Sequence, residues 1–132
     1  MTITEFLLAR IAEDEAEAQE CLLPKNLVPY SDDRIPAVKP EEWGSLVDNY
    51  LGGPMGKHCA RHDPSRVLAE CKAKRAIIEQ AQNATEAEKE YDDYEWQGTV
   101  SRSEPWTGDA ILYALAAVFA DHEDYDPEWA TA

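Results

Sequence analysis

The chain has 132 residues, 44% of them hydrophobic, which suits one folded domain with its own core. It carries 27 acidic and 12 basic residues, a net charge of −15. Such a surface repels phosphate groups, so we do not expect direct binding to nucleic acid or to an anionic membrane. A basic partner protein is compatible with it, although an acidic surface that serves solubility alone is the plainer explanation.

The three cysteines are odd in number, widely spaced and form no C-x-x-C pair; they are Cys21, Cys59 and Cys71. This pattern predicts free thiols in a reducing compartment. The first residues have no basic region typical of a signal peptide, and no apolar run approaches the length that spans a bilayer. The sequence therefore predicts a cytoplasmic protein without a membrane segment.

Capping signals and prolines organise the first part of the chain. Thr2 and Glu5 have the spacing of a capping box, which predicts a helix starting almost at the N-terminus. Pro24 ends that helix, since proline lacks the backbone donor and clashes with the preceding turn. Residues 24–40 contain four prolines and are expected to form an extended connector. Pro40 suits the first position of a short helix.

A central helix follows the glycine-rich segment 52–56, which predicts a turn. Asp63 and Pro64 form a good N-cap and first-position pair, so the helix is expected from about Pro64 onward. Residues 57–75 hold six basic and two acidic residues, which favours packing among acidic helices over a basic binding patch. The apolar stripe of this helix comprises Val67, Leu68, Cys71 and Ile78.

Residues 81–105 form an acidic polar segment and loop. Thr85 and Glu88 repeat the capping-box spacing, so a separate helix is expected to start there, followed by a loop at 98–103. Acidic residues alternate with aromatic ones, a pattern compatible with a partner-binding surface and also with a solvated helix that has one aromatic stripe. The candidate partner-binding residues are Glu86, Glu90, Tyr91, Asp93, Tyr94 and Trp96.

The last helix is expected from residue 106 or 107 to about Asp121, and it is the most hydrophobic segment of the chain. The tail, residues 123–132, is acidic, and we expect its aromatic residues Tyr125 and Trp129 to dock on the body of the protein.

No repeat and no strand-like alternation appears in the sequence. The prediction is an all-α fold over residues 1–132. It is a single domain, a compact bundle of three main helices plus one or two short ones, with the proline-rich connector.

Three segments carry a resemblance: residues 6–15, residues 58–68 with the string H-x-A-R-H-D-P-x-R-V-L, and residues 112–122 with Tyr125 after them. They resemble a family of short actinobacterial and actinophage proteins of unknown function. The resemblance implies a helical cytoplasmic protein, associated with phage or prophage, without assigned chemistry. Many relatives carry a cysteine-rich, zinc-like insertion before the last helix, and this chain has none.

His58, His62 and His122 are all the histidines of the chain. His58 and His62 are four residues apart, so in a helix they could share a metal such as zinc, with Cys59, Asp63, Asp121 or His122 completing the shell. The structural alternative is that these side chains satisfy helix ends. The string H-x-x-x-H lacks the glutamate of H-E-x-x-H, and the sequence has no phosphate loop, dinucleotide fingerprint or nucleophile elbow.

The sequence thus favours binding over catalysis. It predicts a small acidic accessory protein of phage or prophage type that binds, and thereby inhibits, a host protein with a basic or nucleic-acid-binding surface. The alternative is a metal-binding protein or metal-dependent hydrolase that uses His58, His62 and His122. No cofactor is expected apart from zinc in that alternative, and the sequence leaves both the identity of the partner and homo-oligomerisation open.

Overall fold

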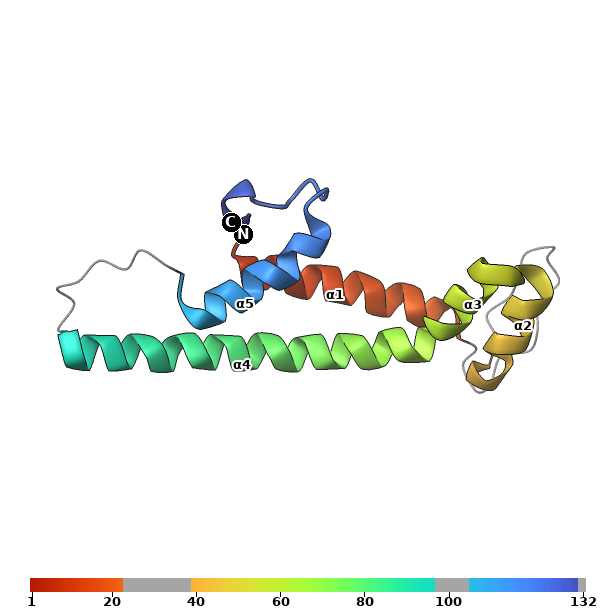
Figure 1. The fold of residues 1–132 in the computed structure, drawn as a ribbon, viewed down its shortest axis with the longest axis horizontal. Coiled ribbons are helices and arrows are strands. Elements are labelled where there is room, and N and C mark those ends of the chain that lie inside the picture. Colours follow the sequence, from red (N-terminus) through yellow and green to blue (C-terminus); the bar gives the residue numbers. More distant parts are fainter. Residues whose placement is uncertain (23–38, 97–104, 131–132) are drawn as a thin grey trace. The chain divides into compact units, whose positions relative to one another are not determined.

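The structure, a computed structural model, describes residues 1–22, 39–96 and 105–130, with side chains at 93–96 excepted (Figure 1). All the elements of these ranges are helices, which confirms the all-α prediction. The predicted connector lies outside the described residues except for its last two positions, and so does the loop at 98–103. The helices are α1 (Ile3–Glu20), α2 (Trp43–Tyr50), α3 (Gly53–Arg61), α4 (Pro64–Trp96) and α5 (Thr107–Ala116), with short 3-10 helices η1 (Pro40–Glu42), η2 (Ala117–Phe119) and η3 (Pro127–Trp129).

The chain divides into two compact units. The terminal unit comprises residues 1–10 and 74–132, and the central unit comprises residues 11–73. Helices α1 and α4 each contribute one part to either unit. The two units are described separately below.

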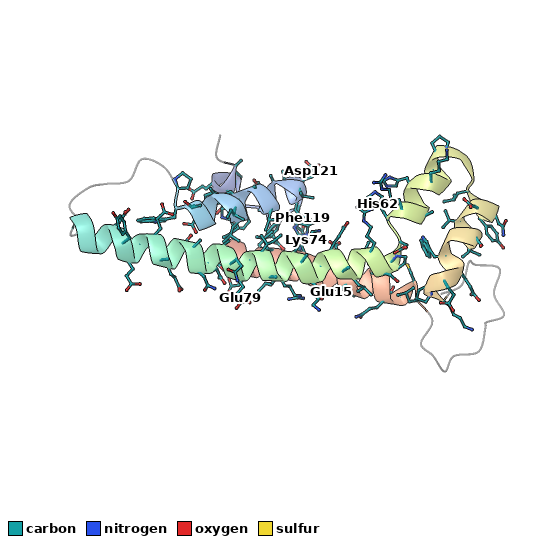
Figure 2. All side chains as sticks on the ribbon, turned by 60° about the horizontal axis from the view of Figure 1, so that its bottom comes forward. Glu15, His62, Lys74, Glu79, Phe119 and Asp121 are labelled. Carbon is teal, nitrogen blue, oxygen red and sulfur yellow. The ribbon has the colours of Figure 1, made fainter. Side chains whose placement is uncertain are left out.

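The core of the terminal unit is built around Phe6, a residue of α1 whose side chain is completely buried. Three rings from the end of the chain surround it: those of Phe119, Tyr125 and Trp129 have centroids 6.1, 6.1 and 5.0 Å from that of Phe6. Phe119 points from η2 toward the long helices, and Asp121 points to the opposite side (Figure 2). Burying a side chain of this size contributes about 1.5–3 kcal/mol. The predicted docking of the tail aromatic residues is confirmed.

Helix α5 lies beside the second part of α4 (Figure 1), and Gly108 is the residue that permits their close approach. A methyl group added at Gly108 would overlap the carbonyl oxygen of Ala81 and the hydroxyl of Thr85. Glu88 also accepts a hydrogen bond from the backbone N–H of Thr107 at 3.0 Å, which satisfies a free donor at the start of α5.

In the central unit, α2 packs against α3, and the first part of α4 packs against the second part of α1. The indole N–H of Trp43 donates to the carbonyl of Cys59 at 2.9 Å, which ties α2 to α3. Gly52 and Gly53 have φ angles of 59° and 58°, a region open to glycine and strained for other residues, so they form the sharp turn between these helices. Among its described residues, the buried side chains are those of Ile11, Ala18, Val47, Pro64 and Cys71.

Two predicted helix starts are confirmed by their hydrogen bonds. The backbone N–H of Thr2 donates to Glu5 at 2.7 Å and that of Glu5 donates to the Thr2 hydroxyl at 3.2 Å, which is a capping box at α1. At α4, the N–H of Arg66 donates to the Asp63 carboxylate at 2.7 Å, so Asp63 is the N-cap.

Three predicted boundaries are wrong. The turn at 52–56 is shorter than predicted, because α3 already begins at Gly53. No separate helix starts at Thr85: α4 continues to Trp96, and Thr85, only 6% exposed, faces α5 in the middle of the helix. The last helix stops being α-helical after Ala116 and tightens into η2.

Candidate functional site

The predicted metal-site residues His58 and His62 lie together at the end of α3. His58 is in the last turn, and His62 follows the helix with its backbone N–H donating to the His58 carbonyl at 3.0 Å. Their ring centroids are 4.5 Å apart, and both side chains are exposed in the central unit. The predicted spacing of one helical turn is therefore confirmed, and the two imidazoles are close enough to bind one ion.

His122 belongs to the terminal unit, where protein groups occupy its ring nitrogens. Arg10 Nη1 lies 2.7 Å from His122 Nδ1 and also contacts Nε2. The backbone N–H of Asp124 donates to the same Nδ1 at 3.0 Å. The ring packs edge-on against Phe6, with centroids 5.6 Å apart. These contacts give His122 a structural role in holding the chain end against α1.

The described residues contain no group of three or more histidine, cysteine, aspartate or glutamate side chains that could hold a metal ion. His58 and His62 are in the central unit and His122 is in the terminal unit. Within the described part of the chain, the structure thus brings together two of the three predicted ligands.

The predicted partner-binding residues lie along the end of α4. Glu86, Glu90 and Tyr91 are exposed, Tyr91 to 62%. Glu86 and Glu90 are four residues apart in the helix and so lie on one face. Asp93, Tyr94 and Trp96 belong to the same helix, and the structure describes their backbone but not their side chains.

A pocket of about 590 Å³ lies in the terminal unit, between α5 and the tail, and the sequence did not predict it. Its lining includes Ala110, Tyr113 and Ala114 of α5 and the tail residues Tyr125 and Trp129. The available signal was the recurrence of alanine at Ala110, Ala114 and Ala117, which leaves small side chains beside Tyr113 on one face of the last helix.

Within the described ranges, no helix combines the length and the apolar composition that crossing a membrane requires.

Comparison with known proteins identifies a family and nothing narrower. Neither the curated proteins nor the solved structures include a match to this chain. One family model, described as "Family of unknown function (DUF6221)", matches residues 1–131. That match spans nearly the whole chain, including both histidine sites, the acidic end of α4 and the pocket. The chain belongs to the DUF6221 family, a family of unknown function.

Proposed function

We propose that this protein acts by binding a basic partner protein, and that the terminal unit is its binding surface. The observation that carries the proposal is the distribution of charge. The terminal unit holds 15 of the 27 acidic residues and 5 of the 12 basic residues. This excess gives the unit a net charge of −10, which attracts basic surfaces and speeds their association.

The end of α4 supports this proposal at the level of side chains. Glu86 and Glu90 supply exposed carboxylates, and Tyr91 supplies an exposed ring beside them. Tyrosine is enriched in protein interfaces, because it buries a large apolar area and keeps a polar end. A protein that itself binds nucleic acid is a fitting target, since its binding face is basic.

The biological setting belongs to the same proposal. Cys21, Cys59 and Cys71 are free thiols, as a reducing cytoplasm favours. The central H-x-A-R-H-D-P-x-R-V-L string supports an actinobacterial or actinophage origin. We propose a phage- or prophage-type accessory protein that inhibits its host target by covering a basic surface.

Capture from host lysate at low and at moderate salt tests this function. We expect one or a few basic proteins to be retained at low salt and to be lost as salt screens the charges. The variant Glu86→Gln/Glu90→Gln/Tyr91→Ala should lose the captured protein. The matched control, Glu17→Gln/Glu20→Gln, removes the same number of exposed charges from α1 and should retain it. Equal capture by both variants would contradict the role of α4, and no capture at low salt would contradict the function.

A second candidate function is metal binding or metal-dependent hydrolysis. The observation that favours it is the 4.5 Å separation of the His58 and His62 rings on an exposed helix end. We expect zinc-supplemented protein to retain metal if this function is right, and His58→Ala to release it. A metal content near zero in the unmodified protein would contradict this candidate without affecting the first.

A further inference from the structure

The pocket of the terminal unit has the size and lining of a ligand site. The C-terminal segment folds back over α5 (Figure 1) and leaves a pocket of about 590 Å³ open to solvent. Small-molecule pockets typically measure about 300–1,000 Å³, so this one has room for a single amino-acid side chain. The pocket floor consists of the small side chains of Ala110 and Ala114 in α5 and of Ala117 in η2. Tyr113, also in α5, and the tail residues Tyr125 and Trp129 supply aromatic rings to the lining.

The aromatic rings that the tail supplies are held in place by the protein itself. The rings of Tyr125 and Trp129 are perpendicular, with centroids 5.5 Å apart, and both pack against the buried ring of Phe6. Asp126 accepts a hydrogen bond from the N–H of Glu128 at 2.9 Å, which caps the short helix that carries Trp129. Rings fixed in this way lose little conformational entropy when a ligand binds between them.

The segment that lines the pocket is acidic, although no charged side chain belongs to the lining itself. From Pro105 to Ala132 the chain has six acidic residues and no lysine or arginine. Four of the six side chains are exposed: those of Asp121, Glu123, Asp124 and Glu128. Such a segment repels anions and attracts cations, and aromatic faces bind cations through the ring quadrupole.

We propose that this pocket binds an arginine side chain of the basic partner protein. The inference rests on the proposed function and names the chemistry that recognises the partner. A guanidinium is planar and weakly hydrated, so it stacks on the faces of tryptophan and tyrosine better than an ammonium does. Its aliphatic stem contacts the alanine side chains, and the exposed acidic residues of the same segment attract its charge at longer range.

A peptide titration followed by NMR tests the proposal on the whole chain. The probe is acetyl-Ala-Ala-Arg-Ala-Ala-amide, and the comparison peptide carries citrulline, which has the same shape without the charge. We expect the arginine peptide to shift the Trp129 indole and the Ala114 amide signals and to bind at least about tenfold more tightly than the citrulline peptide.

Two substitutions of alanine by leucine form a matched pair for the same titration. Ala114→Leu fills the pocket floor and should abolish the shifts, whereas Ala87→Leu adds the same group to an exposed face of α4 and should leave them unchanged. Equal affinity for the citrulline peptide, or shifts confined to residues outside the pocket, would overturn the proposal.

The outcome for the pocket is distinguishable from that for the proposed function. If Ala114→Leu captures the lysate protein as well as the unmodified chain does, the pocket is not the recognition site, although binding of a basic partner stands. If the arginine peptide binds the pocket and the lysate yields no partner, the function fails and the arginine site stands.

Discussion

At the scale of single residues, the contact between Arg10 and His122 is a polar contact that joins α1 to the end of the described chain, beside the ring contacts of Phe6. Arg10 is only 6% exposed, its guanidinium lies over the Phe6 ring at 5.2 Å, and Nη1 donates toward the His122 ring. A buried charge that loses a hydrogen-bond acceptor is destabilised by its desolvation. This pair therefore matters more for stability than an exposed ion pair would.

We predict that His122→Ala lowers the free energy of unfolding by about 1.5–3 kcal/mol, because Arg10 loses an acceptor. Urea denaturation followed by circular dichroism measures this change. His62→Ala is the matched control: its side chain is exposed, so its effect should stay within about 0.5 kcal/mol. A His122→Ala variant as stable as the control would contradict the structural role of His122.

The capping box at α1 predicts a dependence of stability on pH. Hydrogen bonds from Thr2 to the Glu5 carboxylate hold the pKa of Glu5 below its usual value of 4.5. The bond from the backbone N–H of Thr2 has the larger effect, and the bond from its hydroxyl has the smaller one. A carboxyl whose pKa is lower in the folded protein stabilises the fold above the unfolded pKa, and this contribution is lost as pH falls through the folded pKa.

We therefore expect the stability difference between the unmodified protein and Glu5→Gln to be largest above pH 4.5 and to shrink as pH falls below it. Urea denaturation at a series of pH values measures that difference. Glu17→Gln, on an exposed position later in α1, serves as the control. A difference that stays constant over this range would show that the Glu5 carboxylate does not cap the helix.

At the scale of elements, the contact of α5 with α4 depends on the absence of a side chain at Gly108. A Cβ there would lie 2.7 Å from the carbonyl carbon of Ala81, and rigid backbone cannot move aside as a flexible side chain can. The hydroxyl of Thr85 faces the same point, is buried and has no hydrogen-bond partner among the described residues. The contact is thus tight and leaves no room for adjustment.

We predict that Gly108→Ala destabilises the protein by about 1–3 kcal/mol, since α5 must shift away from α4. The matched control is Gly44→Ala in α2, where an added methyl group meets nothing within 4 Å. That control should not lower stability and should raise it by at most about 0.5–1 kcal/mol, because alanine is favoured over glycine in helices and Gly44 lies in the first turn of α2. Thermal unfolding of both variants measures the contrast, and an equal response would contradict the tight contact.

The continuity of α4 shows where local signals mislead. Thr85 and Glu88 have the spacing of a capping box, yet the side chains of both contact α5 and do not cap a helix. Thr85 is buried against Gly108, and Glu88 accepts from Thr107. Tertiary contacts thus use the same two residues without interrupting the helix, and a sequence pattern cannot distinguish the two arrangements.

At the scale of the whole molecule, the net charge of −15 produces self-repulsion in the folded state. Salt weakens this repulsion, since raising NaCl from about 0.02 M to about 0.5 M shortens the Debye length from roughly 20 Å to roughly 4 Å. We expect the midpoint of thermal unfolding to rise with salt over this range.

A variant with fewer exposed acids provides the control for that salt response. It replaces four exposed glutamates by glutamine: Glu86, Glu90, Glu123 and Glu128. Its melting temperature should depend less on salt than that of the unmodified protein, as measured by differential scanning calorimetry. An identical salt response would show that this charge excess does not control stability.

The sequence by itself determined the features that depend on neighbours within one or two helical turns. These are the all-α class, the caps at Thr2 and Asp63, and the proximity of His58 and His62. Each arises from residues three or four positions apart, and that spacing is the same in any helix.

Only the tertiary structure decided the contacts between distant parts of the chain. Arg10 and His122 are 112 positions apart, Gly108 packs on Ala81, and the pocket forms where the tail crosses α5. No local spacing encodes such pairs, because they depend on how helices with similar apolar faces pack against one another.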